Sequence, residues 1–162
     1  MQLRAAGADD VDFLTDMLIE ACNWTGERLI TRGQIQADPA LARYVRGWPR
    51  ASDFGVVAVD DALGPIGAAW ARVFDADGPG YGFVAADVPE ISMAVVRSRR
   101  RQGIGRRLLA ALSDQARVRG WLQLSLSVEH GNRAATLYRD AGFTIVARQR
   151  GADTMLLDLA TA

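Results

Sequence analysis

Hydrophobic and polar positions over residues 90–128 predict a strand, a long helix and a second strand in succession. Apolar side chains take alternate positions over 90–96, which is the two-residue period of a β-strand. From Gly103 to Arg119 they fall three or four positions apart, at Ile104, Leu108, Leu109, Leu112 and Ala116. Alternation returns at Leu122, Leu124, Leu126 and Val128, with polar residues between them. This order predicts a parallel strand pair connected by the helix.

The rest of the chain predicts shorter elements separated by turns. They are a strand at 2–5, a helix from about Asp9, a short helix from Pro39 through Tyr44, strands at 54–59 and 65–74, a helix from Asn132 to Ala141, and strands at 143–148 and 154–159. Residues 23–36 show no clear period and are expected to be irregular. The glycine-rich stretch 75–82 is expected to be a mobile or binding loop. Helices and strands mixed in this way predict an α/β fold.

Composition and charge narrow the class of protein. A length of 162 residues fits one domain, spanning 1–162, and 49% hydrophobic with 23% charged residues is usual for a globular chain. The formal net charge is zero, and every basic residue other than His130 is an arginine, so any basic patch is local. No basic stretch is interleaved with aromatic residues, so nucleic acid is not an expected partner.

Cysteine and histidine are too few for several kinds of site. Cys22 is the single cysteine and His130 the single histidine, so we expect neither an intrachain disulfide nor a metal site, and we assign neither residue to catalysis. The N-terminus does not resemble a secretory leader, and no apolar run approaches the roughly 18 residues that span a bilayer. A cytoplasmic protein without a membrane partner is the expectation.

The segment 100–106 has the composition of a phosphate-binding loop. It lies between a predicted strand and a predicted helix, where unpaired backbone N–H groups point out of the helix end. Gly103 and Gly105 leave the backbone open to a phosphate group, while Arg100, Arg101 and Arg106 supply positive charge. The segment is neither a Walker loop, which needs Gly-Lys-Ser/Thr, nor a three-glycine dinucleotide fingerprint.

Two sequence blocks together resemble the GNAT superfamily of N-acetyltransferases. The segment 100–106 is similar to the family's Arg/Gln-x-x-Gly-x-Gly/Ala motif, which holds the pyrophosphate of acetyl-CoA. The segment 128–143 is similar to its Val-x-x-x-Asn-x-x-Ala-x-x-Leu-Tyr-x-x-x-Gly-Phe block. The resemblance covers about a third of the chain, from Glu90 to Phe143. It implies a mixed, mostly antiparallel sheet that is opened between its two central strands.

The resemblance also implies which residues bind acetyl-CoA. The residues carried over are Met93, Ala94, Val95, Arg100, Arg101, Gln102, Gly103, Ile104, Gly105, Arg106 and Asn132. The strand at 93–95 would pair with the pantetheine arm as an added strand would. Two positions depart from the family: Arg97 stands where a proline usually follows the strand, and Ser127 stands where some members place a glutamate base.

Acetyl transfer sets chemical requirements that residues of this chain can meet. An ammonium with a pKa of roughly 10 must lose a proton before it attacks a thioester. Glu90 is our preferred base, with Asp87, Glu129 or water as alternatives. The Val95 backbone N–H is the candidate donor to the oxyanion, and Tyr138 is the candidate acid for the leaving thiolate.

The acceptor is the least determined part of the prediction. A primary amine of a small molecule is expected, and five acidic residues favour a cationic one weakly: Glu20, Glu27, Asp75, Asp77 and Asp87. Five aromatic residues are candidates to line its pocket or to close a core: Trp24, Tyr44, Trp48, Trp70 and Tyr81. The alternatives are a catalytically silent acyl-CoA sensor and an acetyltransferase acting on a protein amine. Exposed strand edges leave a homodimer open.

Overall fold

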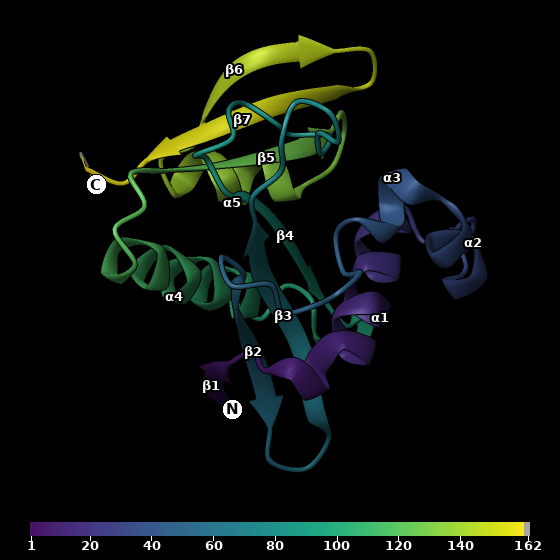
Figure 1. Ribbon diagram of the computed structural model, residues 1–162. Helices are drawn as coiled ribbons and strands as arrows, with labels where there is room; N and C mark the ends of the chain where they lie inside the picture. Colours follow the sequence, from purple (N-terminus) through teal and green to yellow (C-terminus); the bar gives the residue numbers. More distant parts are fainter. Residues whose placement is uncertain (161–162) are drawn as a thin grey trace.

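The computed structural model describes residues 1–160 and has a seven-stranded sheet with helices on both faces (Figure 1). The strands are β1 (Gln2–Ala5), β2 (Phe54–Asp60), β3 (Gly64–Arg72), β4 (Glu90–Val95), β5 (Gln123–Glu129), β6 (Thr144–Gln149) and β7 (Ala152–Asp158), in the order β1-β2-β3-β4-β5-β7-β6. The helices are α1 (Val11–Cys22), α2 (Arg32–Ala37), α3 (Pro39–Ala42), α4 (Ile104–Val118) and α5 (Ala134–Asp140).

The two central strands, β4 and β5, form the parallel pair in an otherwise antiparallel sheet. Their register joins Glu90 to Ser125, and the Ser125 N–H donates to the Pro89 carbonyl at 2.9 Å. Beyond this point the strands diverge, and Figure 1 shows β5 turning away from β4. The predicted mixed, mostly antiparallel sheet, opened between its central strands, is confirmed.

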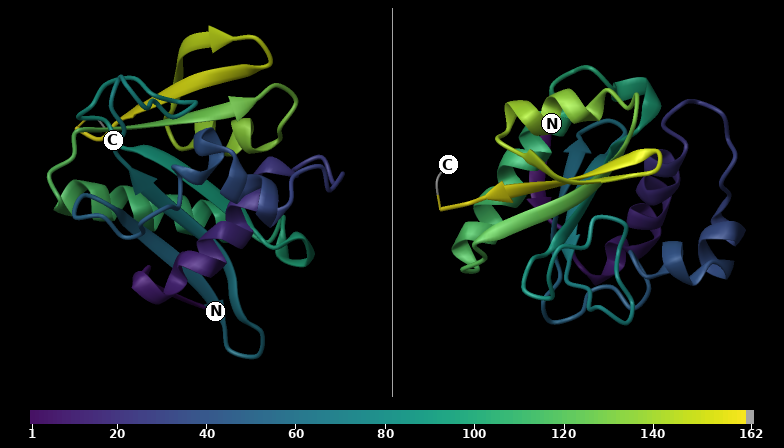
Figure 2. Two further views of the ribbon diagram at one scale, coloured as in Figure 1. Left: turned by 45° about the vertical axis from the view of Figure 1, so that its right-hand side comes forward. Right: turned by 90° about the horizontal axis from the view of Figure 1, so that it is seen from above.

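Each face of the sheet has its own apolar core because the strand side chains alternate between the faces. On one face, the leucines of α4 pack against Ile91, Leu124 and Leu126. On the other face, Leu14 and Leu18 of α1 pack with residues of β2 and β3. Figure 2 shows α1 and α4 on opposite sides of the central strands. The helical period read from 103–119 therefore identified a helix face that is buried.

A short helix, α2, occupies part of the segment expected to be irregular, so that expectation is wrong for residues 32–36. Its first turn is fixed by a capping box, in which Gln34 N–H donates to the Thr31 hydroxyl at 3.3 Å and Thr31 N–H donates to the Gln34 side chain at 2.8 Å. Six residues are too few to show a helical period. The Thr31-x-x-Gln34 pattern was the feature that could have revealed it.

The start of α5 is held by Asn132, one position earlier than a conventional cap. Arg133 occupies the N-cap position, while Asn132 Oδ1 accepts a hydrogen bond from the Ala134 N–H at 2.9 Å. The helix ends before Gly142, whose φ of +97° is available to glycine at low cost. The expected cap at Asn132 is thus present as a hydrogen bond.

Candidate active site

The gap between β4 and β5 exposes backbone hydrogen-bonding groups of β4. The Val96 N–H donates to the Ile66 carbonyl of the β3 side at 2.9 Å. Backbone groups alternate in direction along a strand, so the N–H groups of Met93 and Val95 face the gap. A free strand edge of this kind can pair with an extended chain, such as the pantetheine arm of acetyl-CoA.

The loop after β4 turns sharply into α4. Arg101 adopts a left-handed φ of +62° and Gly103 a φ of +77°, and Gly103 is the N-cap of α4. The loop therefore presents its backbone at the N-terminus of a 15-residue helix, where the helix dipole favours negative charge. Arg101, Gln102, Gly103 and Arg106 are exposed, so their backbone and side chains can meet a pyrophosphate group.

Arg100 differs from the other loop arginines because its guanidinium is already bonded within the protein. Its Nε donates to the Val95 carbonyl at 3.0 Å, and its Nη2 donates to the Glu20 carboxylate at 2.8 Å. The side chain therefore ties the end of β4 to α1, and its charge is paired. The contribution to phosphate binding expected of Arg100 is left to its backbone.

Two further predicted cofactor residues lie where α4 meets α5. A side chain at Gly105 would lie 3.3 Å from Leu137 and 3.7 Å from Met93, so glycine allows this close approach of helices and strand. Ile104, on the same turn, is buried in the core and faces away from solvent. Its expected part in the loop is therefore limited to its backbone.

Tyr138 lies on α5 in the apolar core that also contains Ile91 and Leu126 of the two central strands. Its ring packs against Phe143, with centroids 5.8 Å apart. Burial raises the pKa of the phenol to about 12, so it remains protonated at neutral pH. Among the described residues its hydroxyl makes no hydrogen bond.

Glu90 lies at the start of β4 and is only 3% exposed. Its Oε1 accepts hydrogen bonds from the Tyr44 hydroxyl at 2.6 Å and from the Gly82 N–H at 2.9 Å. Burial raises the pKa of this carboxyl to about 7, although both hydrogen bonds and the charge of Arg43 oppose the rise. A carboxyl with a pKa near neutrality can both accept and release a proton under physiological conditions.

The glycine-rich loop expected at 75–82 covers Glu90. A side chain at Gly80 would overlap the Glu90 carboxylate, and a side chain at Gly82 would overlap the backbone of Leu126 and Ser127. Tyr44 fixes the same loop, because its hydroxyl accepts a hydrogen bond from the Tyr81 N–H at 2.7 Å while donating to Glu90. The absence of two side chains thus lets the loop close over the carboxylate.

Two side chains of β3 hold Tyr44 in place. The Trp70 indole N–H donates to the Tyr44 carbonyl at 3.0 Å. Arg72, buried and paired with Asp53, donates from Nη1 to the carbonyls of Arg43 and Arg46 at 2.7 Å each. Because these bonds fix the backbone on both sides of Tyr44, the hydroxyl that contacts Glu90 has little freedom.

The five aromatic candidates divide into two groups. Trp48 and Trp70 are buried and bonded to backbone carbonyls, so they belong to the core. Tyr81 is 51% exposed and stacks on Tyr44 at a centroid distance of 6.2 Å. The Trp24 indole N–H donates to the Glu129 carboxylate at 2.6 Å. Tyr81 and Trp24 are therefore the two that reach the surface, while Tyr44 is buried against Glu90.

Structural roles account for two of the five acidic residues that favoured a cationic acceptor. Glu20 pairs with Arg100, and Asp75 accepts hydrogen bonds from Asp77 and Gly78 in a turn. Glu27, Asp77 and Asp87 are exposed. The sequence indicated Glu129 only as an alternative base and did not indicate the pairing of Ser125 with Glu90. The surroundings of Glu129 and this pairing both depend on contacts between segments that are distant in the chain.

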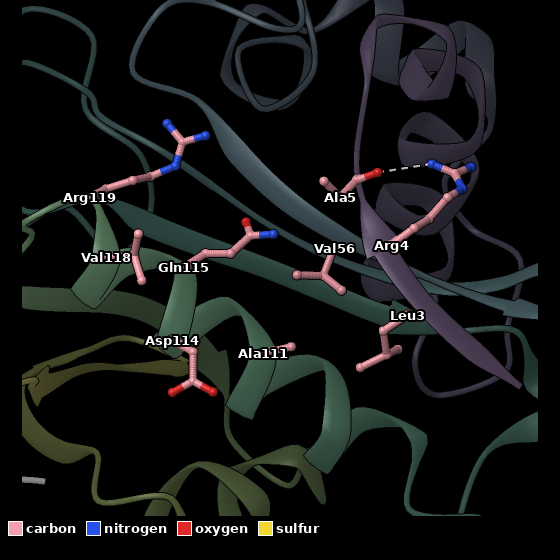
Figure 3. Close-up of a pocket in the computed structure, with 9 residues that line it drawn as sticks. All are labelled: Leu3, Arg4, Ala5, Val56, Ala111, Asp114, Gln115, Val118 and Arg119. Carbon is pink, nitrogen blue, oxygen red and sulfur yellow. Dashed lines mark hydrogen bonds between the residues drawn. The ribbon is translucent and has the colours of Figure 1, made fainter.

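One groove lies away from these residues. It has a volume of about 500 Å³ and lies between β1 and α4, lined by Leu3, Val56, Ala111, Gln115 and neighbouring residues (Figure 3). None of the predicted catalytic or cofactor residues lines it. Within residues 1–160, no cluster of His, Cys, Asp and Glu could hold a metal ion. No helix in the same range is long and apolar enough to cross a membrane.

Comparisons with known proteins agree with this geometry. The family model described as the acetyltransferase (GNAT) domain matches residues 51–145. A ribosomal-protein-alanine N-acetyltransferase from Brucella melitensis is 25% identical, with a TM-score of 0.66 over 96% of this chain and 97% of that one. A phosphinothricin acetyltransferase from Sinorhizobium meliloti, in complex with acetyl-CoA, is 20% identical, with a TM-score of 0.64 over 97% and 87%. An N-acetyltransferase from Thermoplasma acidophilum, in complex with coenzyme A, is 16% identical, with a TM-score of 0.68 over 98% and 99%. No curated protein sequence matches the chain significantly.

Proposed function

The chain belongs to the GNAT family of acetyltransferases, and on this premise we propose that it transfers the acetyl group of acetyl-CoA directly to a primary amine of a small molecule. We take residues 1–162 as one catalytic domain. Tyr138 acts as the general acid and Glu90 as the base. The observation that supports this proposal best is Glu90, a buried carboxylate at the closed end of the β4–β5 gap with a pKa near 7.

The residues proposed to bind acetyl-CoA are arranged to receive an extended, anionic molecule. The free edge of β4 offers the N–H groups of Met93 and Val95 to the pantetheine arm. The loop from Arg100 to Arg106 offers backbone N–H groups and two exposed guanidinium groups to the pyrophosphate. Asn132, at the start of α5, contacts the cofactor arm. Acetyl-CoA supplies the activated thioester.

Glu90 prepares the attacking amine. Its carboxylate accepts the proton of the acceptor ammonium, directly or through water, and its raised pKa makes it a stronger base than an exposed glutamate. Tyr44 and Gly82 bind only Oε1, so the buried Oε2 is the oxygen that takes this proton, and a water carries the proton to it beneath the 75–82 loop. The Val95 N–H donates to the carbonyl oxygen as that oxygen gains negative charge.

Tyr138 donates a proton to the sulfur of the leaving thiolate. A phenol with a pKa of about 12 would protonate a solvated thiolate only unfavourably, because such thiols have a pKa of about 8.5. Burial raises thiol pKa values too, as it does for Cys22, where burial and the Glu129 charge raise the pKa to about 11. The two values therefore approach each other in the apolar gap, and the Tyr138 hydroxyl donates to the sulfur as charge develops there.

Thiol release from acetyl-CoA tests this function. The purified protein is assayed with polyamines, amino acids, aminoglycosides, arylamines and peptides, and products are identified by mass spectrometry. We expect release with one class of small amine, accompanied by an acetylated product. Binding of acetyl-CoA without transfer to any acceptor would favour a sensor. Transfer to peptides alone would favour a protein acceptor, the substrate class named for the Brucella melitensis protein.

A further inference from the structure

A row of polar side chains follows β5 on the face that carries Glu90. Ser125, Ser127 and Glu129 occupy alternate positions, while Leu126 and Val128 between them pack in the core beneath α4. Ser125 is the register partner of Glu90 in the parallel pair, so their side chains leave the sheet on the same face. One carboxylate therefore lies at each end of the row, Glu90 at the closed end of the gap and Glu129 at the open end.

Two buried polar atoms at the closed end have no partner. Glu90 Oε2 and Ser125 Oγ are the buried side-chain N and O atoms that lack a hydrogen bond in the described part of the chain, and Ser125 is 0% exposed. Leaving such an atom unpaired costs about 1–3 kcal/mol. Glu90 and Ser125 are neighbours in the sheet, and each has one buried oxygen without a hydrogen bond. These oxygens mark a place where a polar ligand or its water completes the hydrogen bonding.

The open end combines a carboxylate with an aromatic side chain. The Glu129 carboxylate is exposed and accepts one hydrogen bond, from the Trp24 indole in the segment after α1. Trp24 also approaches the backbone at Gly131, so it bridges from the α1 side of the molecule to the end of β5. Glu129 and Trp24 thus form a hydrogen-bonded pair at the end of β5.

We propose that the acceptor is an aliphatic amine bearing a second cationic group, which Glu129 and Trp24 bind while the reacting amine approaches Glu90. This inference rests on the proposed function. Ser125 and Glu129 are four residues apart on β5, a separation of roughly 13 Å at the strand rise. A chain of several methylene groups spans this distance and passes beside Gly82, which lies against the Leu126–Ser127 backbone in the middle of the row. The cation replaces the indole N–H at Glu129 and lies against the indole face.

Glu129 suits a cation that does not react. An ion pair with a carboxylate stabilises the charged form of an amine and raises its pKa. The reacting amine must become neutral, so a partner that holds its proton would slow attack. Glu90, whose pKa lies near 7, can take that proton, whereas the exposed Glu129 pairs with the second cation, which stays charged. The two carboxylates therefore have different tasks.

The test compares α,ω-diamines of increasing length with monoamines of the same carbon number. kcat/KM is measured for wild type, Glu129→Gln, Trp24→Phe and Trp24→Ala, together with the KM for acetyl-CoA. Asp114→Asn is the matched control, because it removes one exposed negative charge on α4 that pairs only with its own helix. Calorimetric titration of 1,8-diaminooctane into the CoA-saturated protein measures binding without turnover.

Wild type should prefer a diamine over its monoamine, and Glu129→Gln should lower kcat/KM for the diamine about tenfold while changing the monoamine value less than about twofold. Trp24→Phe should retain the preference, since it keeps an aromatic face and removes the competing donor, whereas Trp24→Ala should weaken it. If Glu129→Gln still transfers acetyl groups and its ratio of kcat/KM for diamine to kcat/KM for monoamine is unchanged, this inference is overturned but the proposed function is not. Loss of transfer to every amine in wild type would overturn the proposed function with it.

Discussion

Glu90 is a carboxylic acid that the fold keeps partly protonated near neutral pH. The protonated form is favoured because the group is buried, and the pKa rises from an ordinary 4.5 to about 7. Unfolding returns the pKa to its ordinary value. Between these two values the folded protein binds more protons than the unfolded chain, so its stability falls as the pH rises through this window.

Replacing the ionisable group should remove this pH dependence. We expect Glu90→Gln to gain stability relative to wild type as the pH is raised from 4.5 to 7, by up to about 3 kcal/mol. Urea unfolding of both proteins at several pH values measures the difference. The change with pH is diagnostic, because any constant cost of the buried amide cancels. A difference that does not vary with pH would contradict the raised pKa.

Tyr44 tunes the same carboxyl from the opposite direction. Its hydrogen bond to Oε1 lowers the pKa of Glu90 against the larger effect of burial. Tyr44→Phe should therefore move the rising limb of the kcat/KM profile, expected near pH 7 in wild type, to higher pH. Trp48→Phe is a useful comparison, since Trp48 is a buried aromatic residue whose indole bonds to the Gly7 carbonyl instead. An unshifted midpoint in Tyr44→Phe would argue against Glu90 as the base.

At the scale of elements, sequence patterns predicted the helices and strands that have a regular apolar period. The helix at 104–118 and the strand at 123–129 have long, regular apolar periods and were found where expected. The helix at 32–37 was missed because six residues show a cap but no period. The contacts of Tyr44 and Gly82 with Glu90 join segments far apart in the chain. No local pattern contains such contacts, so the candidate residues could be predicted but not their partners.

The loop over Glu90 depends on glycine at one position more than at another. A Cβ at Gly82 would overlap β5 backbone, which cannot move aside easily, whereas a Cβ at Gly78 would make ordinary contacts at 3.7 Å. Gly82→Ala should cost about 1–3 kcal/mol of unfolding free energy, and Gly78→Ala less than about 0.5 kcal/mol. Denaturant unfolding compares the two. Equal effects would mean that the loop does not lie against β5 in solution.

The turn into α4 is expected to bind acetyl-CoA through its pyrophosphate. Arg101 is exposed in this turn, while Arg117 lies near the other end of the same helix and pairs with Asp114. Arg101→Ala should raise the Kd for acetyl-CoA roughly fivefold, and Arg117→Ala should leave it unchanged. S-acetylpantetheine, which lacks the pyrophosphate, should bind both variants equally. An equal loss of affinity for both thioesters in Arg101→Ala would contradict this role.

Over the whole molecule, the opened sheet separates the residues proposed for two tasks. Tyr138 and the α4 loop lie on one side of the β4–β5 gap, and Glu90, Tyr44 and Trp24 lie on the other. The family resemblance in residues 90–143 was enough to predict this division, because it covers the gap and the cofactor loop. The proposed acceptor side includes residues 23–36 and 75–82, for which the sequence predicted no helix or strand. The hydrogen bonds of this side were known only once the folded structure showed which distant residues are in contact.

The most direct test of the proposed mechanism is the kcat of Tyr138→Phe beside wild type, measured as thiol release with the best acceptor. The Tyr138 hydroxyl has no partner among the described residues, so its removal should leave stability and the Kd for CoA nearly unchanged. We predict a fall in kcat of at least about tenfold, as expected for loss of a general acid. A variant that is equally stable, binds CoA equally well and retains full kcat would show that Tyr138 is only a core aromatic residue.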